Sequence, residues 1–231
     1  VIPDNVTFGN DYLGIVVTGP NTGGKTVLLK TVGLLCGMVK YGLLIPADSD
    51  SNVMIYDQIF CDIGEDQSIE SNLSTFSSHM QNITKIIDSV TPNSLVLFDE
   101  IGSGTDPIEG SNLAKSILKY LIDHNVSFIT TTHYSQLKAF AFDEPKIVNA
   151  SMEFDQNTLS PTYHLLLGVS GSSNAFNIAK KLGLKEEIIK NAKKITITSD
   201  DDIRKLIFKL EKQSKEVEAR NIELKQALAS V

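Results

Sequence analysis

Short apolar runs alternate with amphipathic stretches along most of the chain. The apolar runs have the length and the β-branched content of buried strands, whereas the amphipathic stretches repeat their apolar positions every three or four residues. Strands are predicted at 13–18, 53–56, 94–98 and 126–131, with a hairpin at 147–154 and 162–167. This alternation is typical of an α/β domain with a mostly parallel sheet flanked by helices.

Helices are predicted in the intervals between these strands. The first follows the strand at 13–18 and ends near Gly42, the second stops before Pro92, and the third starts near Pro107. Apolar residues at helical spacing give the second and third helices one face each, which we interpret as core: Ile83, Ile86, Ile87 and Val90, then Leu113, Ile117, Leu118, Leu121 and Ile122. Two shorter helices are predicted at 172–182 and 185–195.

The composition changes near residue 198, so we divide the chain into a domain at 1–198 and a helical segment at 199–231. Ser199 or one of the next three aspartates is suited to cap a long helix. Apolar residues then recur at intervals of seven, at Ile203, Leu210, Val217, Leu224 and Val231. The partner seam is interrupted by Ser214 and Asn221. Two interpretations stay open, the start of a coiled-coil linker and a single amphipathic helix lying on the domain.

Composition narrows the class of protein. With 231 residues, 42% of them hydrophobic and 21% charged, the chain fits one large globular domain. The net charge is −7 and the basic residues are dispersed, so we expect any nucleic-acid contact to lie outside this chain. The sequence has no apolar run of membrane-spanning length and no signal peptide. Cys36 and Cys61 lack metal-ligand spacing, which favours reduced packing residues in a cytoplasmic protein.

One run carries most of the predicted chemistry. It lies between the strand at 13–18 and the first helix, and it fits the phosphate-loop pattern of a glycine, four residues and Gly-Lys-Thr. Its glycines let backbone N–H groups surround phosphates at a helix N-terminus, its lysine adds a positive charge, and its last hydroxyl suits Mg²⁺. The predicted phosphate-binding residues are Gly19, Pro20, Asn21, Thr22, Gly23, Gly24, Lys25 and Thr26.

Two later strands end in polar residues that suit this loop. The strand at 94–98 ends in Asp99 and Glu100, which we assign to the Mg²⁺ shell and to the polarisation of an attacking water. A glutamate in that place favours hydrolysis over transfer. His133 follows the strand at 126–131 and is predicted to reach the γ-phosphate and the water. His79, His124 and His164 have no such setting and are taken as ordinary residues.

Four motifs, in this order and spacing, resemble the ATPase domain of the MutS family over about residues 1–197. They are the phosphate loop, Ser74-Thr75-Phe76, Asp-Glu-Ile-Gly-x-Gly-Thr from Asp99, and Thr-Thr-His-Tyr ending at Tyr134. The members are ABC-type ATPases best known from DNA mismatch repair. The loop variant Thr22-Gly23, the Asp106-Pro107 loop and residues 149–154 resemble the second bacterial subfamily, MutS-two.

The resemblance implies a homodimer whose ATPase domains meet head to tail with ATP and Mg²⁺ between them. It implies that Ser74 contacts the γ-phosphate held by the partner, and that Asn21 contacts the γ-phosphate or the catalytic water. Ser74 also fits a helix N-cap. The resemblance places the adenine near Val1 or Ile2 and Tyr163, although many relatives have an aromatic residue at the first of these positions.

The expected function is that of a bacterial MutS-two ATPase. Its ATP-driven dimerisation would move DNA- or ribosome-binding parts outside this chain, in suppression of recombination or in splitting of collided ribosomes. The chain begins without methionine, so we expect it to be a piece of a larger protein, whose endonuclease activity would belong to an absent Smr domain. The alternatives are a mismatch-repair MutS ATPase and a DNA clamp of the SMC type, but the latter carries Ser-Gly-Gly where this chain has Ser74-Thr75-Phe76.

Overall fold

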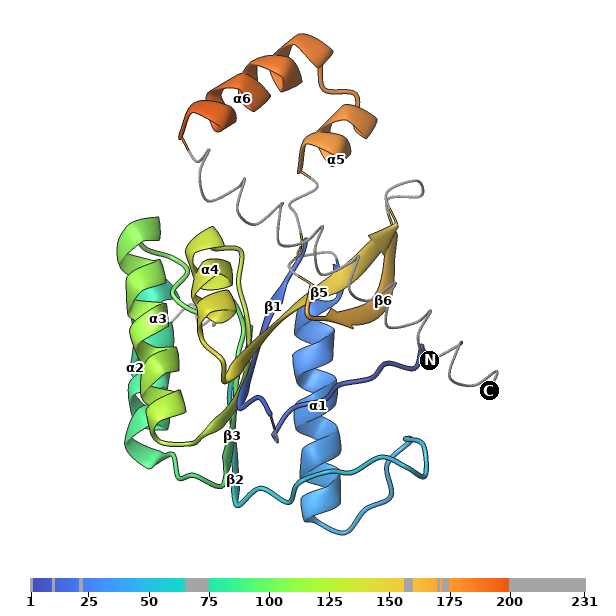
Figure 1. Cartoon of the computed structure of the whole chain (residues 1–231), viewed down its shortest axis with the longest axis vertical. Coiled ribbons are helices and arrows are strands. Elements are labelled where there is room, and N and C mark those ends of the chain that lie inside the picture. The colour runs from blue at the N-terminus through green and yellow to red at the C-terminus, as the bar shows by residue number, and fades with distance from the viewer. Residues whose placement is uncertain are drawn as a thin grey trace, which may run out of the picture.

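The computed structural model describes residues 2–9, 11–20, 23–64, 75–155, 160–169, 171 and 175–199. Its centre is a six-stranded sheet in the order β2–β3–β4–β1–β5–β6 (Figure 1). The strands are β1 (Gly14–Thr18), β2 (Gln58–Asp62), β3 (Ser94–Phe98), β4 (Ser127–Thr131), β5 (Ile147–Asp155) and β6 (Ser160–Leu167). The first five pair in parallel and β6 runs antiparallel to β5. The predicted α/β class with a mostly parallel sheet is confirmed.

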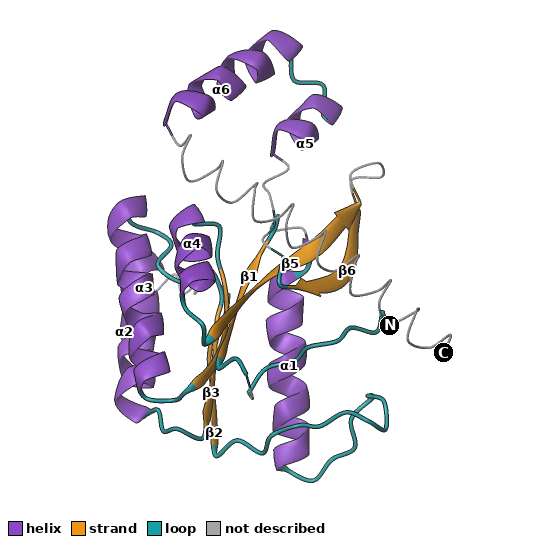
Figure 2. Cartoon of the chain, viewed as in Figure 1, coloured by secondary structure: helices purple, strands orange, loops and turns teal. Residues whose placement is uncertain are grey.

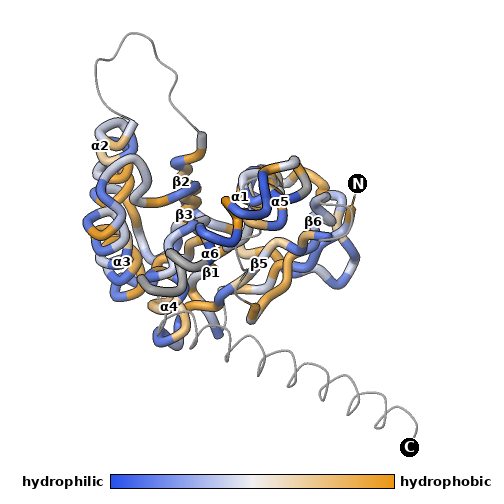
Figure 3. Tube along the Cα trace, turned by 90° about the horizontal axis from the view of Figure 1, so that it is seen from above, coloured by the Kyte–Doolittle hydropathy of each residue, from blue (hydrophilic) through white to orange (hydrophobic). Residues whose placement is uncertain are grey.

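Helices cover both faces of the sheet (Figure 2). They are α1 (Lys25–Lys40), α2 (Thr75–Ser89), α3 (Pro107–Asp123), α4 (Ser135–Asp143), α5 (Ala175–Lys181) and α6 (Glu186–Ser199). Seen from above, α1 lies on one side of the central strands, and α2 and α3 lie on the other (Figure 3). The helix α5 and the following α6 pack on each other beyond one end of the sheet (Figure 1).

The alternation of side chains along the strands divides the core into two layers. Val16, Val96 and Phe128 face the layer under α2, α3 and α4. Their neighbours Ile15 and Leu97 face the layer under α1. The central strands β1, β3 and β4 are buried at every position, as expected for a parallel sheet covered on both faces.

Two expectations about this part of the chain are wrong, and one helix was not predicted. The strand predicted at 53–56 is a coil, in which Met54 and Ile55 are exposed. The true second strand, β2, begins at Gln58, where pairing with Ser94 starts. Leu113, predicted in the core, is exposed on α3. The helix α4 has no counterpart among the predicted elements.

The remaining helix predictions agree closely with the structure. The Asp106 carboxylate caps α3 by accepting from Ile108 and Glu109 N–H groups, and Pro107 occupies the first turn.

Residues 200–231 lie outside the described residues, so the coiled-coil linker and the domain division stay predictions. None of the described helices combines the length and the apolar character that a membrane crossing needs. Both cysteines carry free thiols, but Cys61 is exposed, which contradicts its prediction as a packing residue.

Candidate active site

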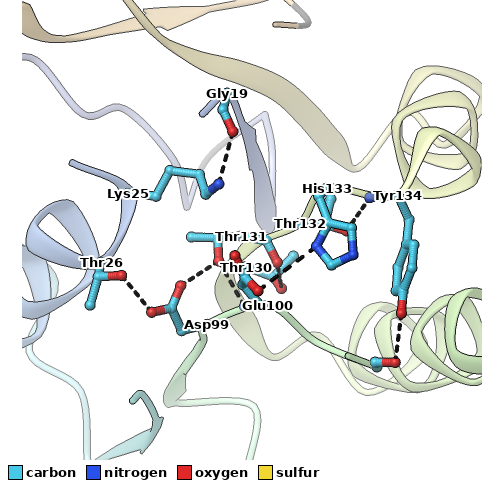
Figure 4. Close-up of polar contacts among 11 residues, drawn as sticks. Gly19, Lys25, Thr26, Asp99, Glu100, Thr130, Thr131, Thr132, His133 and Tyr134 are labelled. Carbon is cyan, nitrogen blue, oxygen red and sulfur yellow. Dashed lines mark hydrogen bonds and ion pairs between the residues drawn. The ribbon is translucent and has the colours of Figure 1, made fainter. Parts of the chain in front are cut away.

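The phosphate loop joins β1 to α1 at the carboxyl edge of the sheet, where ligands of open α/β folds bind. Gly24 precedes α1 with φ 94°, a left-handed conformation that glycine adopts without steric cost. Lys25 is buried to 2% exposure, and its Nζ donates to the Gly19 carbonyl at 2.8 Å (Figure 4). The described part of the loop therefore has the predicted strand–loop–helix context, while Asn21 and Thr22 lie outside the described residues.

The buried amine of Lys25 lies in an acidic setting. Burial lowers the pKa of Lys25 from its ordinary value, because a charged group is less stable away from water. The negative charges of Glu100 and Asp99 act in the opposite direction. A lysine in this place supplies positive charge at the start of α1, beside the phosphate loop.

Thr26 and Asp99 bring two oxygen ligands together from different elements. The Thr26 hydroxyl, in the first turn of α1, donates to Asp99 Oδ2 at 2.6 Å (Figure 4). Asp99 follows β3, and its backbone N–H donates to the Asp62 carbonyl at the end of β2, at 2.8 Å. Hydroxyl and carboxylate oxygens suit Mg²⁺, which nucleotide sites hold through one or two protein oxygens and phosphate oxygens. The donor set at this edge fits the predicted ion.

Glu100 adopts an uncommon backbone conformation next to Asp99. Its φ is 52°, in the left-handed region that non-glycine residues seldom adopt. Its N–H donates to Thr131 Oγ1 at 2.8 Å, and its carboxylate lies 3.8 Å from Nδ1 of His133. The structure thus brings the predicted Glu100 and His133 together at the ends of β3 and β4 (Figure 4).

The residue after His133 fastens the end of β4 to the following loop. Tyr134 is buried, and its phenol donates to the Gly102 carbonyl at 2.9 Å. Burial raises the pKa of Tyr134, and the charges of Glu100 and Asp106 add to the rise, so the phenol keeps its proton near neutral pH. Its ring lies 4.5 Å from the His133 ring, centroid to centroid, which helps to orient the half-exposed histidine.

Tyr163 lies beside the phosphate loop although it comes from the distant strand β6. A Cβ at Gly24 would lie 2.7 Å from the Tyr163 ring, so the two residues are in close contact. The residue remains 43% exposed, so part of it is accessible to a ligand. The Asp4 carboxylate accepts from Leu165 N–H at 2.9 Å, which holds the N-terminal segment against β6. Ile2 in that segment is exposed, and Val1 lies outside the described residues.

Comparison with known proteins agrees with this geometry. The family described as MutS domain V matches residues 15–199, which is most of the chain and runs from the second residue of β1 to the end of α6. The chain belongs to this family. Among similar proteins are three named Endonuclease MutS2. The one from Finegoldia magna is 52% identical over 99% of this chain, that from Brevibacillus brevis 54% over 93%, and that from Alkaliphilus metalliredigens 52% over 97%.

These relatives are much longer than the chain. The matched region covers 30% of the Finegoldia magna protein, 27% of the Brevibacillus brevis protein and 28% of the Alkaliphilus metalliredigens protein. The chain thus spans less than a third of the length of the relatives it matches. Membership of the MutS domain V family identifies it as an ATPase domain of the MutS type.

The structure also contains hydrogen bonds from α2 to Asp62, at the end of β2, that the sequence did not predict. Nδ1 of His79, on α2, lies 2.7 Å from Oδ2 of the buried Asp62, and Asn82 Nδ2 donates to Oδ1 of the same carboxylate at 2.9 Å. The Asp62 carbonyl also accepts from the Asp99 backbone N–H. Through Asp62, the helix α2 is therefore linked to Asp99, the predicted metal ligand. His79 is therefore not an ordinary surface histidine.

A second missed contact links the phosphate loop to the segment before α5. The Thr18 hydroxyl, one residue before Gly19, donates to the Ala150 carbonyl at 3.0 Å and accepts from Gly171 N–H at 2.8 Å. Lys138 Nζ on α4 donates to the Gly171 carbonyl.

Ser74, the predicted ligand of a partner's nucleotide, lies outside the described residues, so its role stays a prediction.

Proposed function

We propose that this chain is the ATPase domain of a MutS2-type protein, which binds ATP with Mg²⁺ and hydrolyses it to ADP and phosphate. The observation that carries the proposal is the convergence of three strand ends on one small volume: Lys25 and Thr26 after β1, Asp99 and Glu100 after β3, and His133 after β4. Family membership and the relatives named Endonuclease MutS2 support it.

Each of these residues has a role that its position supports. Gly19, Pro20, Asn21, Thr22, Gly23 and Gly24 form the loop whose N–H groups receive phosphate oxygens at the start of α1. Lys25 adds a positive charge on the β- and γ-phosphates, while Thr26 and Asp99 hold Mg²⁺ through their hard oxygens. When bound, Mg²⁺ neutralises charge that develops on the phosphate oxygens. Tyr163 offers its accessible part to the adenine.

Hydrolysis rather than phosphoryl transfer follows from the pair beyond the metal ligands. The Glu100 carboxylate polarises the attacking water by accepting its proton, as a general base does. His133, 3.8 Å from that carboxylate, holds its orientation and reaches towards the γ-phosphate, with Asn21 as the further contact to phosphate or water. Glu100 combines this contact with a left-handed backbone conformation, φ 52°.

The site is proposed to work in pairs. Ser74 of a second copy completes the nucleotide site, so the chain acts as a head-to-tail homodimer around ATP. The name Endonuclease MutS2 and the greater length of the relatives support a parent protein that also contains a nuclease, and we infer that it carries DNA- or ribosome-acting parts as well. Closure and opening of the pair would move these parts during suppression of recombination or the splitting of collided ribosomes.

The direct test is nucleotide binding and turnover by the full chain. We expect Mg²⁺-dependent ATP binding and phosphate release. Lys25→Met should lower both by about 100-fold or more, because it removes the charge at the phosphates while keeping the length of the side chain. Lys30→Met, at an exposed position on the same helix, is the matched control and should behave as the wild type. Equal ATP binding by both variants would refute the proposal.

A further inference from the structure

Thr131 lies at the end of β4, beside the two carboxylates that follow β3. Its side chain is fully buried. Its hydroxyl donates to Asp99 Oδ1 at 2.5 Å and accepts from the Glu100 backbone N–H at 2.8 Å (Figure 4). A hydroxyl has one proton and two lone pairs, so donation to the carboxylate leaves a lone pair for the amide. One oxygen atom therefore contacts both residues of the Asp-Glu pair.

The contact fixes the orientation of the Asp99 carboxylate. Oδ1 accepts from Thr131 on β4 and Oδ2 accepts from Thr26 on α1, so the two oxygens point to different elements. Rotation about the Cβ–Cγ bond would break both hydrogen bonds. The oxygen that faces Thr26 is thereby kept on the side of the phosphate loop, where the proposed Mg²⁺ site lies.

The same hydroxyl supports the backbone of Glu100. A left-handed conformation at a non-glycine residue persists only where its surroundings hold it in place. The N–H of Glu100 is held by an oxygen on the neighbouring strand, and the pairing of Phe98 with Thr130 brings that strand into register. Release of this N–H would free the chain after Asp99 to move Glu100 away from His133.

We propose that Thr131 is a positioning residue that sets the metal ligand Asp99 and the base Glu100 with one hydroxyl. The inference rests on the proposed function and deepens it, since it names a residue to which that function assigns no role. Thr131 touches neither substrate nor metal and acts through the two carboxylates. A hydroxyl is required at this position, while the methyl group of threonine serves packing alone.

The hydroxyl is tested by substitutions that separate hydrogen bonding from shape. Thr131→Val keeps the shape and removes the hydroxyl, whereas Thr131→Ser keeps the hydroxyl and removes the methyl group. Thr130→Val is the matched control, since Thr130 is equally buried on the same strand and its hydroxyl makes a long 3.4 Å contact with the Thr131 carbonyl. Thermal unfolding of each variant shows whether it is folded, and Thr131→Ala replaces Thr131→Val if the latter fails to fold.

The readout is the affinity for a fluorescent ATP analogue, measured in Mg²⁺ and again in EDTA. The ratio of the two affinities isolates the contribution of the metal ion. Because a hydrogen bond to a charged group is lost, we expect Thr131→Val to lower this ratio by roughly tenfold. Its kcat at saturating Mg²⁺ should fall by roughly 10- to 100-fold. Thr131→Ser and Thr130→Val should stay within about twofold of the wild type in both measurements.

The possible outcomes separate the two proposals. A Thr131→Val protein with the wild-type ratio and kcat would overturn the role of Thr131 and leave the proposed function intact. A Thr131→Ser protein as impaired as Thr131→Val would also overturn it, because packing would then explain the loss. A wild-type chain that binds the analogue in neither condition would overturn the proposed function and this inference with it.

Discussion

The buried charge of Lys25 at the phosphate loop lowers the stability of the folded chain. The side chain is buried to 2% exposure, its amine donates to the Gly19 carbonyl, and burial lowers its pKa. A buried ammonium group loses most of its hydration, and the hydrogen bond to the Gly19 carbonyl and the nearby charges of Glu100 and Asp99 replace only part of it. The compensation comes when phosphate oxygens, the ligand of the proposed function, meet that charge.

This cost predicts opposite effects of one substitution on stability and on binding. Lys25→Met should raise the free energy of unfolding of the nucleotide-free chain by about 1 kcal/mol, because an unbranched apolar side chain occupies the same space without a desolvated charge. Urea unfolding without nucleotide measures this change. At the exposed Lys30, the matched Lys30→Met substitution should change stability by less than about 0.5 kcal/mol. A Lys25→Met chain less stable than the wild type would contradict the argument.

At the residue scale, sequence reasoning found the side chains that follow a strand directly. Asp99 and Glu100 are predictable because a buried apolar run ends just before them, and His133 because it closely follows the buried strand β4; the structure brings the three together. Thr131 and His79 were missed as site residues for a physical reason. Their contacts join residues 32 and 17 positions apart, across different elements, and a sequence with many polar residues offers no local sign of such pairs.

Among the elements, the loop after Glu100 packs on α3 through two glycines. A Cβ at Gly110, inside α3, would overlap with the Gly102 carbonyl oxygen. Gly102 itself has φ 78°, and its carbonyl oxygen accepts a hydrogen bond from the Tyr134 phenol. The loop is thereby fixed between α3 and the end of β4, and the contact requires glycine at Gly110 although alanine is the better helix former.

Two helix glycines therefore predict stability changes of opposite sign. Gly110→Ala should destabilise the chain by about 1–3 kcal/mol, because the methyl group meets backbone that cannot move aside. Gly37→Ala, inside α1, adds a methyl group in open space and should stabilise the chain by about 0.5–1 kcal/mol through helix propensity. Thermal unfolding compares the two. Stabilisation by both substitutions would show that the loop does not press on α3.

Strands that are buried along their whole length were predicted more accurately than elements that are partly exposed. The strands β1, β3 and β4 are buried throughout, so their apolar runs marked them clearly in the sequence. The edge strand β2 is mostly exposed or half-buried and has polar residues at both ends, so the more apolar run at 53–56 was predicted as the strand in its place. The short helix α4 buries just Leu137 and Ala141, too few positions to show a helical period.

In the proposed homodimer, half of each active site lies on a second copy of the chain. Ser74 of one chain would complete the site formed by Lys25 and Glu100 of the other. A mixture of two inactive variants then regains activity, since a heterodimer of Ser74→Ala and Lys25→Met contains one intact composite site. Random pairing of equal amounts should restore about a quarter of wild-type turnover.

Titration of one variant into the other, with phosphate release as the readout, measures this complementation. Each variant alone serves as the control and should show little turnover. A mixture no more active than the two variants separately would contradict the composite site, whereas full activity of Ser74→Ala alone would remove Ser74 from it.

The chain is proposed to hydrolyse ATP with Glu100 as the base, and a Glu100→Gln variant provides the decisive test. The amide keeps the size of the side chain but cannot take a proton from water. Turnover should fall by about 100-fold or more while Mg²⁺-dependent ATP binding is retained. Glu109→Gln, at an exposed position in the first turn of α3, is the matched control and should hydrolyse ATP as the wild type does. Undiminished phosphate release by Glu100→Gln would show that Glu100 is not the base.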